Sequence, residues 1–228
     1  MRVSMLVAVS LLVAGCSHAI GSHSHPTTTV SLSTTAPVAA PPAKPPVPRS
    51  APGAGAPIAD VIAWVEAAAP ADAARYHSAI RDGTTTELGD DIAFTGPSGP
   101  AGKVRCMTDT KHSGATLSCL VDLSTPLPRP ATAYGEWKGG WVDFSGSSLQ
   151  VGSARADPGP FIDGDGPQLP DGSSLSFGDF RCRADHVGLF CVNYAYRSAV
   201  RLAAAGVEPF GCLRPVPPPD GVGAKFSC

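Results

Sequence analysis

Two stretches of the chain repeat one cysteine pattern, and this repeat constrains the fold more than any other feature. Arg105-Cys106-Met-Thr-Asp109 is followed by a turn and Leu117-Ser-Cys119, and Arg181-Cys182-Arg-Ala-Asp185 is followed by a turn and Leu189-Phe-Cys191. Each copy is typical of a β-hairpin whose two strands carry facing cysteines. We therefore predict the disulfides Cys106–Cys119 and Cys182–Cys191 and, by elimination, Cys212–Cys228. The chain has no Cys-x-x-Cys pair, which argues against a zinc site.

The remaining pattern predicts an α+β domain that is mainly β. Apolar residues at 58, 61, 62 and 65 share one helix face, and a second short helix is expected over residues 70–80, ending near Asp82-Gly83. Beyond Gly83, short apolar runs alternate with Gly, Pro and Asp clusters, which favours antiparallel strands stapled by the disulfides. We expect these strands around 91–94, 104–107, 116–121, 141–144, 149–151, 180–182 and 189–192.

Charge excludes several classes of function. The 228 residues carry a formal net charge of -2, and the few Lys and Arg are scattered, so we expect no nucleic-acid partner. A charged fraction of 16% is too low for a coiled coil.

The sequence also lacks the G-x-S-x-G, H-E-x-x-H and P-loop motifs, so it indicates no cofactor and no catalytic residue, and leaves enzyme activity open.

The N-terminus resembles that of a bacterial lipoprotein. Arg2 precedes a short apolar run, and Val13-Ala14-Gly15-Cys16 matches a lipobox. The resemblance implies a signal peptide over residues 1–15, diacylglycerol on the Cys16 sulfur and, in some organisms, a further acyl chain such as palmitate on the new amino group. Two or three acyl chains give stable anchoring, so we expect an exported protein on the outer face of the plasma membrane.

Three regions are expected along the chain. After the signal peptide, residues 16–57 form a lipidated Pro-, Ser- and Thr-rich tether, in which residues 17–57 hold nine Pro and no Asp or Glu. Such a segment cannot bury enough apolar surface to offset its ordering entropy. Residues 58–228 form the disulfide-containing globular domain.

Several motifs together are similar to mycobacterial lipoproteins of the LppI type, with a Cys-paired β domain. They are Phe94 with Pro97-Ser98-Gly99, the four hairpin cysteines, residues 153–161, and Leu175 to Asn193. The resemblance covers nearly the whole chain and implies a cell-envelope lipoprotein. It assigns no activity and no functional residues.

Two clusters are candidate sites. Tyr134, Glu136, Trp137, Trp141 and Asp143 flank Lys138-Gly139-Gly140, which we interpret as a hairpin turn; the two Trp rings would then stack in the core or form an exposed ligand platform. The second cluster is an Asp-rich loop, either a plain turn or a weak calcium site. Its carboxylates are Asp157, Asp163, Asp165 and Asp171.

Three hypotheses about function follow. The first is a non-enzymatic module that binds an envelope protein, lipid or glycan. The second is a hydrolase acting on cell-wall material, for which Glu136 and Asp143 are a candidate carboxylate pair. The third is a purely structural tethered module. A concave site with convergent titratable groups would separate the hydrolase from the others.

Overall fold

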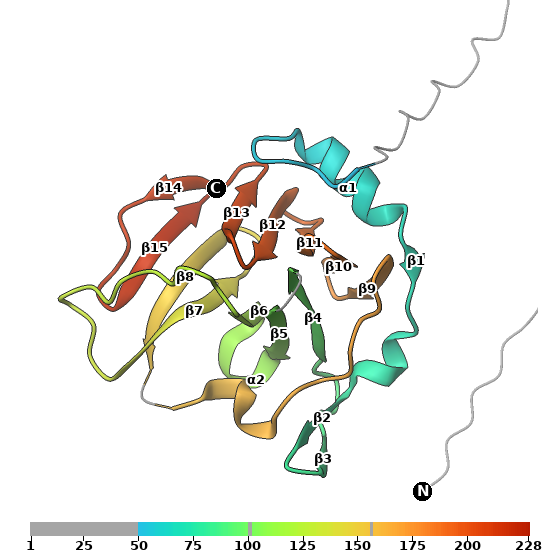
Figure 1. Ribbon diagram of the computed structural model, residues 1–228, viewed down its shortest axis with the longest axis horizontal. Helices are drawn as coiled ribbons and strands as arrows, with labels where there is room; N and C mark the ends of the chain where they lie inside the picture. Colours follow the sequence, from blue (N-terminus) through green and yellow to red (C-terminus); the bar gives the residue numbers. More distant parts are fainter. Residues whose placement is uncertain (1–49, 100–101, 156) are drawn as a thin grey trace, which may run out of the picture. The chain divides into compact units, whose positions relative to one another are not determined.

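The computed structural model describes residues 50–99, 102–155 and 157–228 (Figure 1). The expected signal peptide, Cys16 and the tether as far as residue 49 lie outside the described residues. Where the chain is described, its helices are all too short or too polar to cross a bilayer. The predicted mainly β fold with antiparallel strands is confirmed.

Three sheets and four short helical segments make up the described chain. In order across each sheet, the six-stranded sheet contains β1 (Ala69–Pro70), β9 (Ser173–Phe177), β10 (Phe180–Asp185), β11 (Gly188–Asn193), β12 (Ser198–Ala203) and β13 (Gly206–Phe210). The seven-stranded sheet contains β14 (Arg214–Val216), β15 (Val222–Ser227), β8 (Ser148–Arg155), β7 (Glu136–Phe144), β6 (Gly114–Val121), β5 (Gly102–Asp109) and β4 (Ala93–Gly99). The third sheet is the hairpin β2 (Ser78–Arg81) and β3 (Thr84–Glu87). The helical segments are α1 (Ile58–Glu66), η1 (Ala73–Tyr76), α2 (Thr110–Ser113) and η2 (Gly159–Asp163).

The main core lies between the two large sheets. Alternate residues of each strand point inward, as the period of two in a β-strand requires, and both sheets contribute to one buried cluster. Phe144 of the seven-stranded sheet meets Phe180 of the six-stranded sheet edge to face, with ring centroids 5.6 Å apart. Because side chains alternate along a strand, the residues between these inward ones point to the two outer faces.

Each copy of the cysteine pattern lies within a unit of five consecutive strands, and this unit occurs twice. Strands β4 to β8 form one antiparallel meander, and β9 to β13 form another. Across the first, Cys106 stands opposite Cys119, which stands opposite Val142. Across the second, the corresponding row holds Cys182, Cys191 and Val200. The two meanders are therefore built in the same register around their disulfides.

The structure pairs the six domain cysteines as predicted. The Cα–Cα distance is 4.1 Å for Cys106–Cys119 and 4.0 Å for Cys182–Cys191, and both bonds join directly opposite residues of a hairpin. The third bond joins Cys212, just before β14, to Cys228 at the end of β15. Each bond closes a short loop and so removes conformational freedom from the unfolded chain.

Helix α1 covers the outer face of the six-stranded sheet, as Figure 1 shows beside β10 and β11. Its apolar stripe is buried, and Trp64 packs against Phe190 with ring centroids 4.6 Å apart. Ala51 and Ala56, which precede the helix, pack against the same cluster. The folded part therefore includes residues that we assigned to the tether.

The second predicted helix, over residues 70–80, is wrong. Only one 3-10 turn forms, with the Asp72 carboxylate accepting a hydrogen bond from Ala74 N at 3.1 Å. The chain then enters the β2–β3 hairpin, where Asp82 and Gly83 both have positive φ, 50° and 80°. An Asp-Gly pair with these angles makes the tight turn that a β-hairpin prefers, and the β-branched residues Thr84 to Thr86 favour the strand that follows.

We expect a thiol reductant to open Cys212–Cys228 in the native protein while the two hairpin disulfides stay intact. All four hairpin sulfurs are buried, whereas Cys228 is exposed. Alkylation of the released thiols followed by peptide mass spectrometry measures which bond opens first. In denaturant, the same treatment should label all six cysteines. Native labelling of Cys106 or Cys182 before Cys212 would contradict the expectation.

Candidate functional site

A cleft of about 910 Å³ lies on the outer face of the seven-stranded sheet. Strands β5 to β8 form its floor, and α2 borders it. The β2–β3 hairpin contributes Thr86 and Glu87, and the segment 157–163 that contains η2 contributes a further wall. The corresponding face of the six-stranded sheet is the one that α1 covers, so the first meander keeps open a surface that the second has filled.

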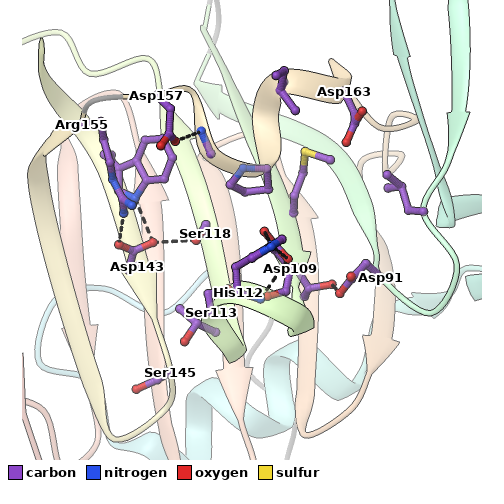
Figure 2. Close-up of a pocket in the computed structure, with 18 of the residues that line it drawn as sticks. Asp91, Asp109, His112, Ser113, Ser118, Asp143, Ser145, Arg155, Asp157 and Asp163 are labelled. Carbon is purple, nitrogen blue, oxygen red and sulfur yellow. Dashed lines mark hydrogen bonds and ion pairs between the residues drawn. The ribbon is translucent and has the colours of Figure 1, made fainter.

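The Asp143 carboxylate lies on the cleft floor, beside Arg155 and Ser118 (Figure 2). Ser118 Oγ and Trp141 Nε1 donate to its Oδ1 at 2.6 and 2.9 Å, and Arg155 Nη2 donates to its Oδ2 at 2.6 Å. These donors come from three adjacent strands, β6, β7 and β8. The side chains of Asp143 and Arg155 are only 22% and 31% exposed, so the ion pair is partly removed from water.

Arg155 also stacks on an aromatic ring. Its guanidinium carbon lies 3.9 Å from the centroid of the Trp141 ring, in a cation–π contact. Phe161 of η2 meets Trp141 edge to face at 5.2 Å between centroids. With these neighbours Trp141 is only 2% exposed, and it acts as a packed floor under the polar groups of the cleft.

A second polar pair stands at the α2 side of the cleft. Asp109 ends β5 and caps α2, because its carboxylate accepts a hydrogen bond from His112 N at 3.2 Å. The same carboxylate contacts His112 Nδ1 at 2.8 Å. The His112 side chain is 68% exposed, so its ring combines a fixed orientation with access to solvent.

Acceptor oxygens dominate the lining of the cleft. Its six carboxylates are Glu87, Asp91, Asp109, Asp143, Asp157 and Asp163, against the cation of Arg155 and the ring of His112. Asp91 accepts from Thr108 Oγ1 and Thr110 N, and Asp157 accepts from Gly159 N. An ionised carboxylate accepts hydrogen bonds and donates none. The cleft can therefore satisfy a ligand that brings hydrogen-bond donors and positive charge.

The five residues of the predicted aromatic platform do not gather in one place. Trp141 and Asp143 lie on the cleft floor, but Tyr134 is 92% exposed in the preceding loop. Glu136 pairs with Lys138, and Trp137 donates its Nε1 hydrogen to Leu127 O at 2.9 Å. Glu136 and Asp143 are therefore not brought together as a catalytic carboxylate pair in the cleft.

The hairpin turn predicted at Lys138-Gly139-Gly140 is also wrong, because β7 runs through it. Gly139, Gly140 and Trp141 stand opposite the single residue Gly152 of β8, so the strand bulges. A Cβ on Gly139 would lie 2.8 Å from Leu127 O, and one on Gly140 would collide with Val121 O. The two glycines are needed because the backbone of residues 121 and 127 packs closely against this part of β7.

The four weak calcium candidates are dispersed. Asp157 and Asp163 line the cleft, whereas Asp165 pairs with Lys103 at 3.1 Å and Asp171 lies elsewhere. Across the described ranges, no three His, Cys, Asp or Glu side chains are placed to share a metal ion. The predicted lipid-anchor residue, Cys16, lies outside the described residues.

Sequence reasoning did not single out Asp109, Ser118 or Arg155 as site residues. A signal for one of them was present: Ser118 adjoins Cys119, which the hairpin pattern places inward, so Ser118 must face outward, where it stands opposite Asp143. Arg155 comes to Asp143 through the β7–β8 pairing, which residue spacing alone does not predict.

Comparisons with known proteins give no relationship: no family model, no curated protein and no solved structure matches this chain.

Asp143→Asn should lower the free energy of unfolding by about 1–2 kcal/mol, because it leaves the partly buried Arg155 without its counter-charge. Urea unfolding measures the change. Asp165→Asn is the matched control: its ion pair with Lys103 is solvent-exposed, so we expect less than about 1 kcal/mol. Equal effects of the two substitutions would contradict a structural role for the Asp143 cluster.

Proposed function

We propose that this chain is a cell-envelope lipoprotein of the kind its N-terminus resembles, held on the outer face of the plasma membrane by an acylated Cys16, and that its cleft binds a ligand there. Three disulfides support this location, because such bonds persist in oxidising compartments and are rare in the cytosol. The lipobox and the Pro-rich segment that follows it support anchoring at a distance from the bilayer.

The observation that carries the binding role is the acceptor-rich lining of the cleft. Six carboxylates face a cavity large enough for a small ligand or a polymer segment. Glu87 and Asp163 have no ion-pair partner in the described chain, so a cationic group could occupy their side of the cleft. The ligand class that fits is a donor-rich molecule with amino groups, such as the amine-bearing parts of a cell-wall peptide or glycan.

A second candidate function is hydrolysis of cell-wall material. The Asp109–His112 pair favours it, because an oriented and accessible imidazole can move a proton. Binding is preferred for two reasons. Asp143 is occupied by three donors, and within the described residues no serine hydroxyl bonds to His112 as a nucleophile would.

Cys16→Ser should shift the protein from the membrane fraction to the soluble or secreted fraction, since the acyl chains attach to its sulfur. Fractionation of cells followed by immunoblotting measures the distribution. Intact mass spectrometry of the wild-type protein should show a diacylglyceryl group on its first residue. A membrane-bound serine variant would contradict anchoring through Cys16.

We expect the cleft to bind glucosamine oligomers, which carry amines, more tightly than N-acetylglucosamine oligomers by at least about tenfold. The double substitution Glu87→Gln/Asp163→Asn should remove that preference, as measured by isothermal titration at low salt. Asp60→Asn/Asp82→Asn makes the same change in net charge outside the cleft and should leave it intact.

Two outcomes would contradict this binding role. One is equal affinity for the two oligomers, and the other is equal loss of affinity in both double variants. Release of soluble fragments from purified cell wall by the wild type, but not by His112→Ala, would favour the hydrolase instead.

A further inference from the structure

A second, smaller pocket lies on the outer face of the six-stranded sheet, beside the first residues that the structure describes. Its volume is about 460 Å³. One wall is formed by residues 50–53, another by Trp64 of α1, and the floor by β10 and β12. Unlike the cleft described above, this pocket brings two guanidinium groups together: Arg183 and Arg201 line it, along with the ring of His186 and the carboxylate of Asp185.

Arg183 stacks on Trp64, with its guanidinium carbon 3.6 Å from the ring centroid. It donates one hydrogen bond, from Nη1 to Trp64 O at 2.5 Å, close to the carboxyl end of α1. Its Nε is buried and has no hydrogen-bond partner in the described parts of the chain. Burial lowers the pKa of Arg183, and the carboxylates of Asp185 and Asp171 act in the opposite direction.

Arg201 stands two strands away from Arg183 in the same row. Both residues are opposite Phe190, Arg183 on β10 and Arg201 on β12. Two strand spacings place their Cα atoms about 10 Å apart, so the two long side chains can reach one group between them. Arg201 donates from Nη1 to Glu208 Oε2 at 3.2 Å, and its Nε is also buried with no partner among the described residues.

The first meander shows what is missing around Arg183. There, the arginine stacked on tryptophan is Arg155, and Asp143 supplies it with a carboxylate at 2.6 Å. In the first meander Val142 stands opposite Cys119, and Asp143 is the next residue. In the second, Val200 stands opposite Cys191, and Arg201 is the next residue. At the position where the first meander has a carboxylate, the second therefore has another arginine.

Asp185 and Asp171 lie near enough to influence the charge of Arg183, but neither forms an ion pair with it. Asp185 contacts His186 Nδ1 at 2.9 Å and accepts from Val187 N at 3.2 Å, and Glu208 binds Arg201. No ion pair within the described residues involves Arg183. Two guanidinium groups that approach from separate strands need several acceptor oxygens, and a phosphate offers these together with a negative charge that can balance both cations.

We propose that this pocket binds a phosphate group between Arg183 and Arg201, as a site separate from the acidic cleft. The phosphate would give Arg183 from outside the chain the counter-charge that Asp143 gives to Arg155 in the first meander. A lipid headgroup and a soluble phosphate ester both offer this chemistry.

The test is titration of the purified full chain with inorganic phosphate at low salt, followed by isothermal calorimetry. Arg183→Gln and Arg201→Gln should each weaken binding by about tenfold or more. Glu208→Gln, which releases Arg201 from its internal partner and removes a negative charge, should strengthen binding. Arg155→Gln is the matched control, an arginine stacked on tryptophan whose charge is already paired, and it should leave phosphate binding unchanged.

Because Arg183 also bonds to Trp64 O, Arg183→Gln could loosen α1. Arg183→Lys keeps the charge but loses the fork of N–H groups, so it should bind phosphate more weakly than the wild type, and circular dichroism checks that each variant is folded. Unchanged phosphate binding in folded Arg183→Gln and Arg201→Gln would overturn the proposal. So would an equal loss in Arg155→Gln.

Sedimentation with vesicles identifies the source of the phosphate. If vesicles of phosphatidylcholine with phosphatidylglycerol bind the chain through Arg183, and inorganic phosphate competes, the group belongs to a lipid headgroup. If inorganic phosphate binds through Arg183 and vesicles do not compete, the ligand is a soluble phosphate ester. Absence of binding to both probes would overturn the proposal.

Discussion

The contact between the inner faces of the two meanders is the constraint on which the rest of the structure depends. Both hairpin disulfides lie in the core between the sheets, together with the apolar residues of alternate strand positions. A strand cannot turn one set of side chains inward without turning the other set outward. The outward residues of the two rows are therefore fixed on opposite outer surfaces. They are Met107, Ser118, Asp143 and Gln150 on one and Arg183, Phe190, Arg201 and Glu208 on the other.

One outer surface is covered and the other is open, because α1 packs only on the six-stranded sheet. Phe190, in the middle of the second row, forms an apolar contact for Trp64. Ser118, at the corresponding place in the first row, instead donates to Asp143. A hydroxyl paired with a carboxylate gives a helix no apolar surface to bury, so the first surface stays open as a cleft.

The sequence predicted the parts of the fold that local constraints decide. The cysteine hairpins were predictable because facing cysteines, a turn and alternating residues lie within about fifteen positions of one another. The Lys138-Gly139-Gly140 turn was mispredicted because glycine is used both in turns and where another segment approaches the backbone closely, and residue spacing does not distinguish the two uses. Here it admits Leu127 and Val121 of a neighbouring segment instead of reversing the chain. The helix expected over residues 70–80 failed because the positive φ of Asp82 and Gly83 selects a hairpin.

The candidate site was predicted in fragments. Trp141 and Asp143 came from one sequence cluster, and Asp157 and Asp163 from another, and nothing in the spacing showed that both clusters line a single cleft. That meeting depends on η2, whose Phe161 lies against Trp141. The residues joining the fragments, Arg155 among them, are brought in by strand pairing, which a single sequence does not reveal.

An arginine stacked on a tryptophan occurs on both outer surfaces, and its consequences depend on the neighbouring charge. Stacking covers one face of the guanidinium but uses none of its N–H groups, which lie in the plane of the group. On the first surface Asp143 accepts from that edge, so the charge of Arg155 is paired within the chain and the remaining carboxylates decide what the cleft attracts. On the second surface Arg201 adds a second cation beside Arg183. The same scaffold therefore presents an acidic surface on one side and a basic pocket on the other, and at one matching position the first has Asp143 where the second has Arg201.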